Sequence, residues 1–303
     1  MDVLSLLGVI GGLLALVAVG VALRMSGLLA ADDSRPLNTV LMYVALPALI
    51  FSSVHRAQLD PALGMLPAIA WAVAIAGLAI GWVLSRLLKL EGPLAGAFIM
   101  ACVFGNTGYM GYPVASALMG DPGLVRAIFS DVFGNTAAVI SVGSVVAGFY
   151  GAHDVKVNPL KEIVTFPPFI ALAAALVLHG VPMPEVVTSW LDALGTIVVP
   201  VIMISVGLSL KPRELKGHLS LASVVVAVKL VVLPLLALGL GTLLLDDPDS
   251  LRVAVIEAGV PTMMLLVIMG QRFKLDSDFI ASAILATMVG AVVTVPLFQL
   301  LIG

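Results

Sequence analysis

Two short stretches of this sequence combine glycine, proline and polar residues inside long apolar segments, and they are the places where chemistry is expected. The stretches are Gly105-Asn-Thr-Gly-Tyr-Met-Gly-Tyr-Pro113 and Glu257-Ala-Gly-Val-Pro-Thr262. Glycine and proline disfavour the interior of a helix, so each stretch predicts a break. A break creates a half-helix whose first N–H groups are unpaired and carry positive partial charge. Such an end favours an anion such as a carboxylate, and the carbonyl groups freed on the other side favour a cation.

The side chains expected to contact the anion lie in these two breaks. Asn106 and Thr107 are the main candidates, because an amide beside exposed N–H groups can both donate to and accept from a ligand. Thr262 has the analogous position after Pro261, although a threonine there can also bond its own backbone. A packing kink with no ligand is the alternative for both breaks. The predicted substrate-binding residues are Gly105, Asn106, Thr107, Gly108, Pro113, Pro261 and Thr262.

Three ionisable residues lie deep in predicted apolar segments, where a charge normally faces a wet cavity or a partner. We expect Glu257 to carry a coupling ion, H⁺ or Na⁺; the alternative is a protonated carboxyl bonded to a neighbouring helix. Asp131 and Asn135 are one helical turn apart and share a face. They join Glu257 as ion-coupling candidates, with a simple Asp131–Asn135 bond as the alternative. Lys229 is a candidate charge partner for the substrate or for a buried carboxylate. No resident metal or cofactor is predicted.

The elements that hold these residues are expected to be membrane-spanning helices. Of the 303 residues, 61% are hydrophobic and 11% are charged, whereas a soluble domain is about 25% charged. This composition excludes an ordinary soluble enzyme and a disordered scaffold, and a single cysteine excludes an intramolecular disulfide. The net charge of −3 with no long basic run argues against a nucleic-acid partner. Hydrolase and P-loop motifs are absent from the sequence, so an enzyme is not expected.

Ten apolar segments are long enough to cross the bilayer. The first five are 3–23, 36–54, 65–88, 93–119 and 125–150, and the second five are 163–179, 189–210, 219–245, 251–271 and 279–302. Pro47 and Pro200 have similar surroundings in the second and seventh segments, and the breaks interrupt the fourth and ninth. Because five is odd, the second half must enter the membrane inverted. The sequence therefore predicts an all-α polytopic membrane protein with ten transmembrane helices in a 5+5 inverted repeat. Residues 1–150 form the first repeat, 151–162 a cytoplasmic linker and 163–303 the second repeat.

The distribution of lysine and arginine predicts the orientation of these spans. Arg56, Arg126 and Arg252 lie in loops on the amino-terminal side, and Lys229 lies inside a span. The other eleven lie on the opposite side: Arg24, Arg35, Arg86, Lys89, Lys156, Lys161, Lys211, Arg213, Lys216, Arg272 and Lys274. Loops rich in basic residues face the cytoplasm. Both termini are therefore expected outside the cytoplasm, in a multi-pass protein of a bacterial inner membrane.

Several passages resemble the auxin efflux carrier family, which includes the plant PIN carriers and many bacterial permeases. They are Leu37-Asn-Thr-Val-Leu-Met-Tyr-Val-Ala-Leu-Pro-Ala-Leu-Ile-Phe-Ser52, the Gly105 stretch, Pro200-Val-Ile-Met-Ile-Ser-Val-Gly-Leu-Ser-Leu210 and Lys229-Leu-Val-Val-Leu-Pro234, with Thr287 and Pro296 in the tenth span. The resemblance implies two broken helices that cross at the substrate site, as in the NhaA and bile-acid-symporter type of fold. It also implies scaffold and transport domains drawn from both repeats, elevator-like alternating access and organic-anion cargo. Asn106 would be the crossover asparagine and Pro261 the crossover proline.

Two positions depart from the plant pattern of this family. Gly105 stands where many relatives have a proline, and Glu257 stands where plant carriers have an uncharged polar residue. The glutamate is similar to that of the bile-acid sodium symporters. The predicted function is secondary active transport of a small organic anion, a carboxylate in the leading reading. The alternatives are a sodium-coupled organic-anion symporter and a non-transporting membrane ligand sensor. The expected partners are the anion, the lipid bilayer and a second copy of the chain in a homodimer.

Overall fold

The computed structural model describes residues 3–151, 155, 158–209 and 217–302. The predicted linker 151–162 lies only partly among them, and Lys156, Lys211, Arg213 and Lys216 lie outside them. Throughout the described ranges the regular structure is helical, with one isolated β-bridge and no strand. Six helical segments are long and apolar enough to cross a membrane: Ala31–Arg56, Pro61–Leu87, Thr107–Tyr150, Glu185–Ser209, Leu219–Leu244 and Ser277–Ile302. The fold is that of a polytopic membrane protein, as the sequence predicts.

The helices before residue 151 are interrupted by several π-helical turns, in which hydrogen bonds join residues five apart. The α-helices are α1 (Val3–Met25), α2 (Ser34–Val40), α3 (Leu46–Arg56), α4 (Met65–Leu87), α5 (Gly92–Val103), α6 (Tyr112–Ser130) and α7 (Ser144–Tyr150). The π-helical turns are η2 (Leu41–Ala45), η4 (Thr107–Gly111), η5 (Asp131–Thr136) and η6 (Val139–Gly143), and η1 (Ala31–Asp33) and η3 (Pro61–Gly64) are 3₁₀ turns.

The helices after residue 158 are also interrupted by a π-helical turn. They are α8 (Pro159–Val164), α9 (Pro167–Val177), α10 (Glu185–Thr196), α11 (Val198–Ser209), α12 (Leu219–Ala227), the π-helical turn η8 (Val228–Val232), α13 (Leu233–Leu244), α14 (Pro248–Gly259), α15 (Leu265–Phe273) and α16 (Ser277–Ile302). Two of the prolines that the sequence singles out lie near a local irregularity, because proline removes a backbone donor, whereas Pro296 lies inside α16. Pro47 follows η2, and Pro200 lies in the first turn of α11, just after the interruption at Ile197.

One predicted boundary differs from the structure. The sequence predicts a short loop between spans 93–119 and 125–150, but helical structure runs from Thr107 to Tyr150 almost without a gap. Two helices meet inside α6 at Gly120, whose φ of +66° and ψ of −154° are not helical. A positive φ costs glycine little because it has no Cβ. The turn is therefore made by one residue instead of a loop.

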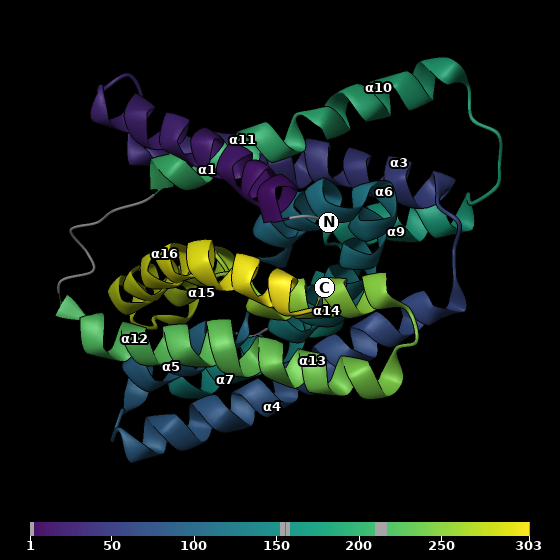
Figure 1. Ribbon diagram of the computed structural model, residues 1–303. Helices are drawn as coiled ribbons and strands as arrows, with labels where there is room; N and C mark the ends of the chain where they lie inside the picture. Colours follow the sequence, from purple (N-terminus) through teal and green to yellow (C-terminus); the bar gives the residue numbers. More distant parts are fainter. Residues whose placement is uncertain (1–2, 152–154, 156–157, 210–216, 303) are drawn as a thin grey trace.

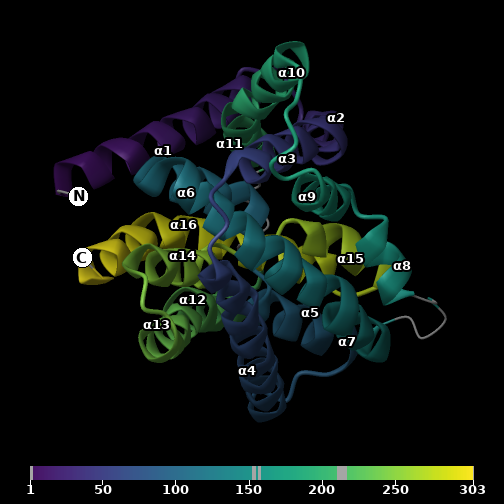
Figure 2. The ribbon, with the colours of Figure 1, turned by 90° about the vertical axis from the view of Figure 1, so that its right-hand side faces the viewer.

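The helices form two groups that are visible in Figures 1 and 2. The first group, α1–α3 with α9–α11, lies at the top of both views. The second group contains α4, α5, α7 and α12–α16, and α6 runs between the two. A separate buried apolar cluster underlies each group, and α6 contributes to both. Within the first group, α1 and α11 touch backbone to backbone, because a Cβ added to Gly20 would lie 3.0 Å from the Gly207 Cα.

The start of α14 is fixed by a charged group outside the spans. Asp247 precedes the helix, and its side chain accepts hydrogen bonds from the backbone of Asp249 and from Ser250. Arg126 also donates to it, at 2.7 Å. Burial raises the pKa of Asp247, but the bonds from Ser250, Arg126 and Asp249 outweigh burial, so the pKa lies below its ordinary value. The carboxylate is thereby held ionised at the positive end of the helix dipole.

Candidate functional site

The two interrupted helices lie against each other at the centre of the molecule. Helix α5 ends at Val103 and α14 ends at Gly259, and the chain beyond each end is extended. Gly105 and Thr262 form an antiparallel bridge. The N–H of Asn106 donates to the Pro261 carbonyl at 2.7 Å, and the N–H of Met263 donates to the Phe104 carbonyl at 2.9 Å. Both breaks that the sequence predicts are therefore present, and each supplies hydrogen-bond partners to the other.

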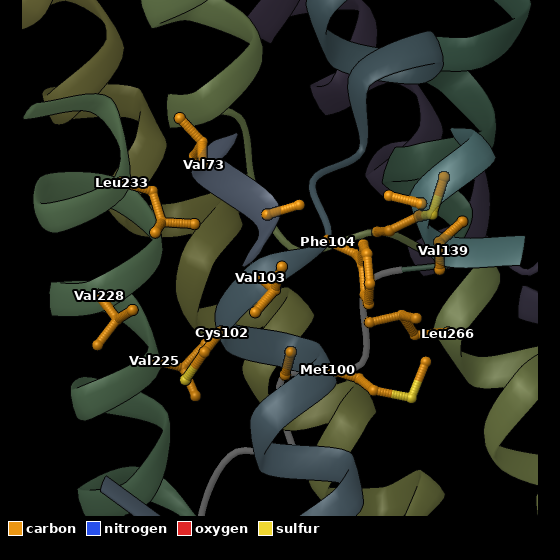
Figure 3. Packing of buried hydrophobic residues seen from close by; sticks show 14 of the residues in the cluster. Val73, Met100, Cys102, Val103, Phe104, Val139, Val225, Val228, Leu233 and Leu266 are labelled. Atoms are coloured by element: carbon orange, nitrogen blue, oxygen red, sulfur yellow. The ribbon is translucent and has the colours of Figure 1, made fainter. Parts of the chain in front are cut away.

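The end of α5 is surrounded by buried apolar side chains. Figure 3 shows Phe104 and Val103 among residues of α4, η6, α12, α13 and α15. Phe104 is fully buried. Non-helical backbone at membrane depth is stable only where it is buried in protein or lines a cavity. The packing in Figure 3 meets the first of these conditions for one side of the crossing.

The carbonyl groups freed by the breaks are satisfied by specific side chains. The hydroxyl of Thr262 donates to the Ala101 carbonyl at 2.9 Å, and the amide of Asn135 donates to the Gly105 carbonyl at 2.9 Å. The Lys229 ammonium donates to the Ala258 carbonyl at 2.5 Å. An unsatisfied buried carbonyl costs about 1–3 kcal/mol. These three contacts therefore stabilise the broken conformation.

A cavity of about 630 Å³ opens between the two helix groups and reaches the first break. Of the predicted substrate-binding residues, Asn106 and Gly108 line it; Gly105, Thr107, Pro113, Pro261 and Thr262 do not. Thr262 is fully buried and its hydroxyl bonds a carbonyl of α5, so the structure does not place it in the cavity wall. Its partner is a carbonyl of the other break, which neither reading of the sequence foresaw. Asn106 is the predicted residue best placed to contact a ligand.

The side-chain amide of Asn106 has no protein partner in the part of the chain that the structure describes. The residue is 5% exposed, and its backbone N–H and carbonyl are bonded to Pro261 and Met110. The amide lies in the cavity wall, where the half-helix formed by η4 and α6 begins. Because the amide lines the cavity, its donor and acceptor are available to a polar ligand there.

Sequence reasoning missed part of the cavity wall. Tyr109 and Tyr112 flank the first break, where the sequence allows either a pocket wall or plain packing, and both line the cavity. Thr136 lines it beside them, and Met263 and Met264 line it after the second break. The methionines look like ordinary packing in the sequence. Thr136 could be found only by knowing that η5 is π-helical, because a π turn places residues five apart on one face. Residues of η1, α2, η2, α3, α11, α15 and α16, with two at the start of α9, complete the wall: Ala31, Asp32, Ser34, Arg35, Asn38, Thr39, Met42, Tyr43, Leu46, Ile50, Phe166, Pro168, Val206, Ser209, Leu265, Val267, Ile268, Gln271, Ala281, Ile284, Leu285 and Met288.

Asp131 is held in the cavity wall by three hydroxyl groups. Thr107 and Thr136 donate to Oδ1 at 2.6 and 2.7 Å, and Tyr112 donates to Oδ2 at 2.8 Å. Asn135 faces the same region but bonds Thr107 and the Gly105 backbone. The structure therefore brings Asp131 and Asn135 together, and Thr107 bonds both of them.

A second chamber of about 30 Å³ lies on the other side of Thr107. Glu257 and Lys229 line it, together with Asn135 and Ser130. The structure thus places Glu257 in this chamber and not in the large cavity. Both carboxylate oxygens of Glu257 are buried and have no hydrogen-bond partner. Among the described residues, no ion pair within 4.0 Å includes Glu257 or Lys229.

The three glycines of the first break each face an ionisable side chain. A Cβ on Gly105 would lie 2.9 Å from the Lys229 Nζ, and a Cβ on Gly108 would lie 3.3 Å from the Asp131 Oδ2. A Cβ on Gly111 would collide with the carboxylate of Glu257. Contacts under 3.0 Å force a neighbour to move. The glycine spacing therefore does more than interrupt a helix, because it makes room for three buried polar groups.

The chain belongs to the membrane transport protein family, whose sequence profile matches residues 10–158 and 152–299. This assignment confirms the resemblance to the auxin efflux carriers that the motifs indicate. It also agrees with the polytopic helical fold, which six long apolar helices in the described residues define.

Three relatives are similar to this chain over most of their length. An uncharacterized transporter of Methanothermobacter thermautotrophicus is 32% identical over 292 residues, which is 95% of this chain and 96% of the relative. An uncharacterized transporter of Methanocaldococcus jannaschii is 30% identical over 294 residues, or 94% and 95% of the two chains. A Rhizobium meliloti protein named "Putative malonate transporter" is 30% identical over 275 residues, or 86% and 84%. The chain is thus a membrane transport protein.

Proposed function

We propose that this protein is a secondary active transporter of a small organic anion, a carboxylate, and that Asn106 binds the anion. The unpartnered amide of Asn106 in the wall of the 630 Å³ cavity is the observation that carries this proposal. The half-helix that starts beside it has the positive end of its dipole at the same place. The name of the Rhizobium meliloti relative supports a carboxylate as the class of substrate.

Elevator-like alternating access fits the division of the helices. In this proposal α1–α3 and α9–α11 form the scaffold domain, and the other helices form the transport domain that carries the crossing. Each group has its own buried cluster, and the cavity lies between them. Ten spans then form a 5+5 inverted repeat of residues 1–150 and 163–303, joined by a cytoplasmic linker at 151–162. The antiparallel pairing of the breaks supports this symmetry, because each break falls in the fourth predicted span of its half.

The remaining parts of the proposal concern ions, location and assembly. Glu257, Asp131 and Asn135 form the ion-coupling set, with H⁺ or Na⁺ as the coupling ion and no other cofactor. The unpartnered oxygens of Glu257 favour ion coupling, and they keep a sodium-coupled symporter as the second candidate. We place the protein in a bacterial inner membrane, and the distribution of basic residues supports both termini outside the cytoplasm. Exposed apolar side chains on α10, such as Trp190, leave a face for lipid or for a homodimer.

The test of substrate binding uses purified protein and proteoliposomes. Malonate and monocarboxylates are screened by thermal unfolding, because a ligand of the native state raises apparent stability. Asn106→Ala should weaken binding of a hit by about 10–100-fold, the equivalent of about 1.5–3 kcal/mol for hydrogen bonds to a charged group. Asn158→Ala is the matched control, since this exposed asparagine caps α8 and does not line the cavity.

Two outcomes would contradict the proposal. Unchanged affinity in folded Asn106→Ala protein would exclude Asn106 from the site. Binding without flux of the labelled anion into proteoliposomes would show a ligand sensor instead of a transporter.

A further inference from the structure

Two buried groups of opposite charge face the small chamber behind the crossing. Glu257 is 5% exposed and Lys229 is 1% exposed, and both line a space of about 30 Å³. This volume is about that of one water molecule. Lys229 is anchored by its bond to the Ala258 carbonyl, whereas both oxygens of Glu257 lack a partner. The chamber therefore has one fixed charged group and one whose partner is absent.

The charged and titratable groups that face Glu257 come from three elements. Lys229 on η8 attracts its carboxylate, and Asp131 on η5 repels it. Tyr112 on α6 also faces it, and Cys102 on α5 faces Lys229. The Asp131 carboxylate already accepts three hydroxyl donors. Lys229 is therefore the counter-charge available to Glu257.

Lys229 occupies the position in which a cation would be expected. Carbonyl groups at the carboxyl end of a half-helix are natural cation ligands, and the ammonium of Lys229 binds one of them in α14. Its Nζ also lies 2.9 Å from where a Cβ of Gly105 would be, so the absence of a side chain at Gly105 leaves space for it. A sodium ion about 4 Å from this ammonium would lose on the order of a thousandfold in affinity, at an effective dielectric constant of about 20. A proton needs no ligand shell, only a carboxylate oxygen.

We infer that the coupling ion is a proton carried on Glu257, and that the ammonium of Lys229 is a fixed counter-charge in place of a bound sodium ion. The inference rests on the proposed transport function, which supplies the cycle. A proton from water on one side of the membrane binds the Glu257 carboxylate and gives a neutral carboxyl. On the other side the same O–H bond breaks, the proton returns to water, and Lys229 stabilises the carboxylate.

A hydrogen-bonded chain connects this chamber to the large cavity. The amide of Asn135, which lines the chamber, donates to the Thr107 hydroxyl at 2.9 Å, and Thr107 donates to Asp131 at 2.6 Å. Asp131 lines the large cavity. Three side chains, those of Asn135, Thr107 and Asp131, therefore lie between the chamber that holds Glu257 and a ligand in the large cavity. This short chain is the structural basis for coupling between them.

The experiment compares sodium with potassium and needs no substrate. Thermal unfolding of the purified wild-type protein is measured over a range of NaCl and KCl concentrations at equal ionic strength. The wild type should respond equally to both salts. Lys229→Gln removes the charge but keeps a donor for Ala258, so it should gain a saturable, sodium-specific rise in apparent Tm. Adding Glu257→Gln should abolish the gain, and Lys161→Gln on the exposed part of α8 is the matched control.

Further arms keep the inference falsifiable if Lys229→Gln does not fold. Lys229→Arg keeps the charge and should remain indifferent to sodium. A separate measurement in proteoliposomes follows the flux of the labelled anion. In the wild type this flux should depend on an imposed pH gradient and not on a sodium gradient, and in Glu257→Gln the dependence on the pH gradient should be lost. A saturable sodium-specific stabilisation of the wild type that Glu257→Gln removes would overturn the inference. That result would leave carboxylate binding at Asn106 untouched, because the two are measured with different ligands.

Discussion

Substituting Gly111 with alanine tests whether the glycine spacing of the first break makes room for Glu257. An added Cβ would lie 2.7 Å from the Glu257 Cδ and 2.8 Å from Oε2. Real Cβ atoms essentially never approach so closely, so either the carboxylate or the η4 turn has to move. Overpacking of a buried site costs about 1–3 kcal/mol. Alanine has a better helix propensity than glycine, which offsets up to about 1 kcal/mol of this cost. Gly111→Ala should therefore lower the free energy of unfolding modestly.

A double-mutant cycle isolates the contact from this propensity gain. Unfolding in detergent is measured for the wild type, Gly111→Ala, Glu257→Ala and the double variant. The coupling free energy should be about 1–3 kcal/mol, because Glu257→Ala removes the atoms that the new Cβ meets. Glu257→Gln keeps the size of the side chain and should not relieve the clash, which separates steric effects from charge. Gly12→Ala is the control, since its Cβ would meet nothing within 4 Å.

The reasoning fails if Gly111→Ala has the same effect in the wild type and in the Glu257→Ala background. In that event Gly111 interrupts the helix but does not determine where the carboxylate lies, and the assignment of glycines to ionisable partners would have to be abandoned.

Three other substitutions test the packing around the site by the same unfolding assay. Thr262→Val should cost about 1–3 kcal/mol because it leaves the Ala101 carbonyl unsatisfied; no loss would show that water replaces the hydroxyl. Asp247→Asn should be less stable than the wild type at neutral pH. The lowered pKa of Asp247 means that its stabilisation is complete above the ordinary Asp pKa of about 4 and is lost as the pH falls through the lowered value. The two curves should therefore converge in acid, and a constant difference would refute this. Gly20→Ala should separate α1 from Gly207 and lower the apparent Tm, whereas an unchanged Tm would show that α1 can shift freely.

The breaks were predictable because the signal is local. Glycine and proline within a few residues disfavour a helix whatever surrounds them, so the sequence is sufficient to place interruptions near Asn106 and Pro261. The apolar length of the segments is equally local, and it predicts a polytopic helical protein. The turn at Gly120 was missed because a single glycine in an apolar stretch has many other uses.

The partners of the buried polar groups were not predictable, because they are set by contacts between distant parts of the chain. Thr262 looks like a ligand contact in the sequence, and only the crossing reveals that the Ala101 carbonyl needs its hydroxyl. The sequence shows Glu257 and Lys229 at membrane depth but cannot show that they share one chamber. Thr136 joins Asp131 through a π-helical turn, whose register differs from the α-helical spacing that sequence reasoning assumes.

The reciprocal pairing of the two breaks has a consequence for how the protein matures during synthesis. The Ala101 carbonyl and the Thr262 hydroxyl that satisfies it are 161 residues apart in the chain. The first half therefore enters the bilayer while its broken helix still has unpaired polar backbone, a situation that costs several kcal/mol in hydrocarbon. The missing donor, the Thr262 hydroxyl, becomes available only after the second half has been synthesised. Nascent chains truncated before Thr262 should consequently remain open to membrane proteases, and resistance to them should arise late and in a single step.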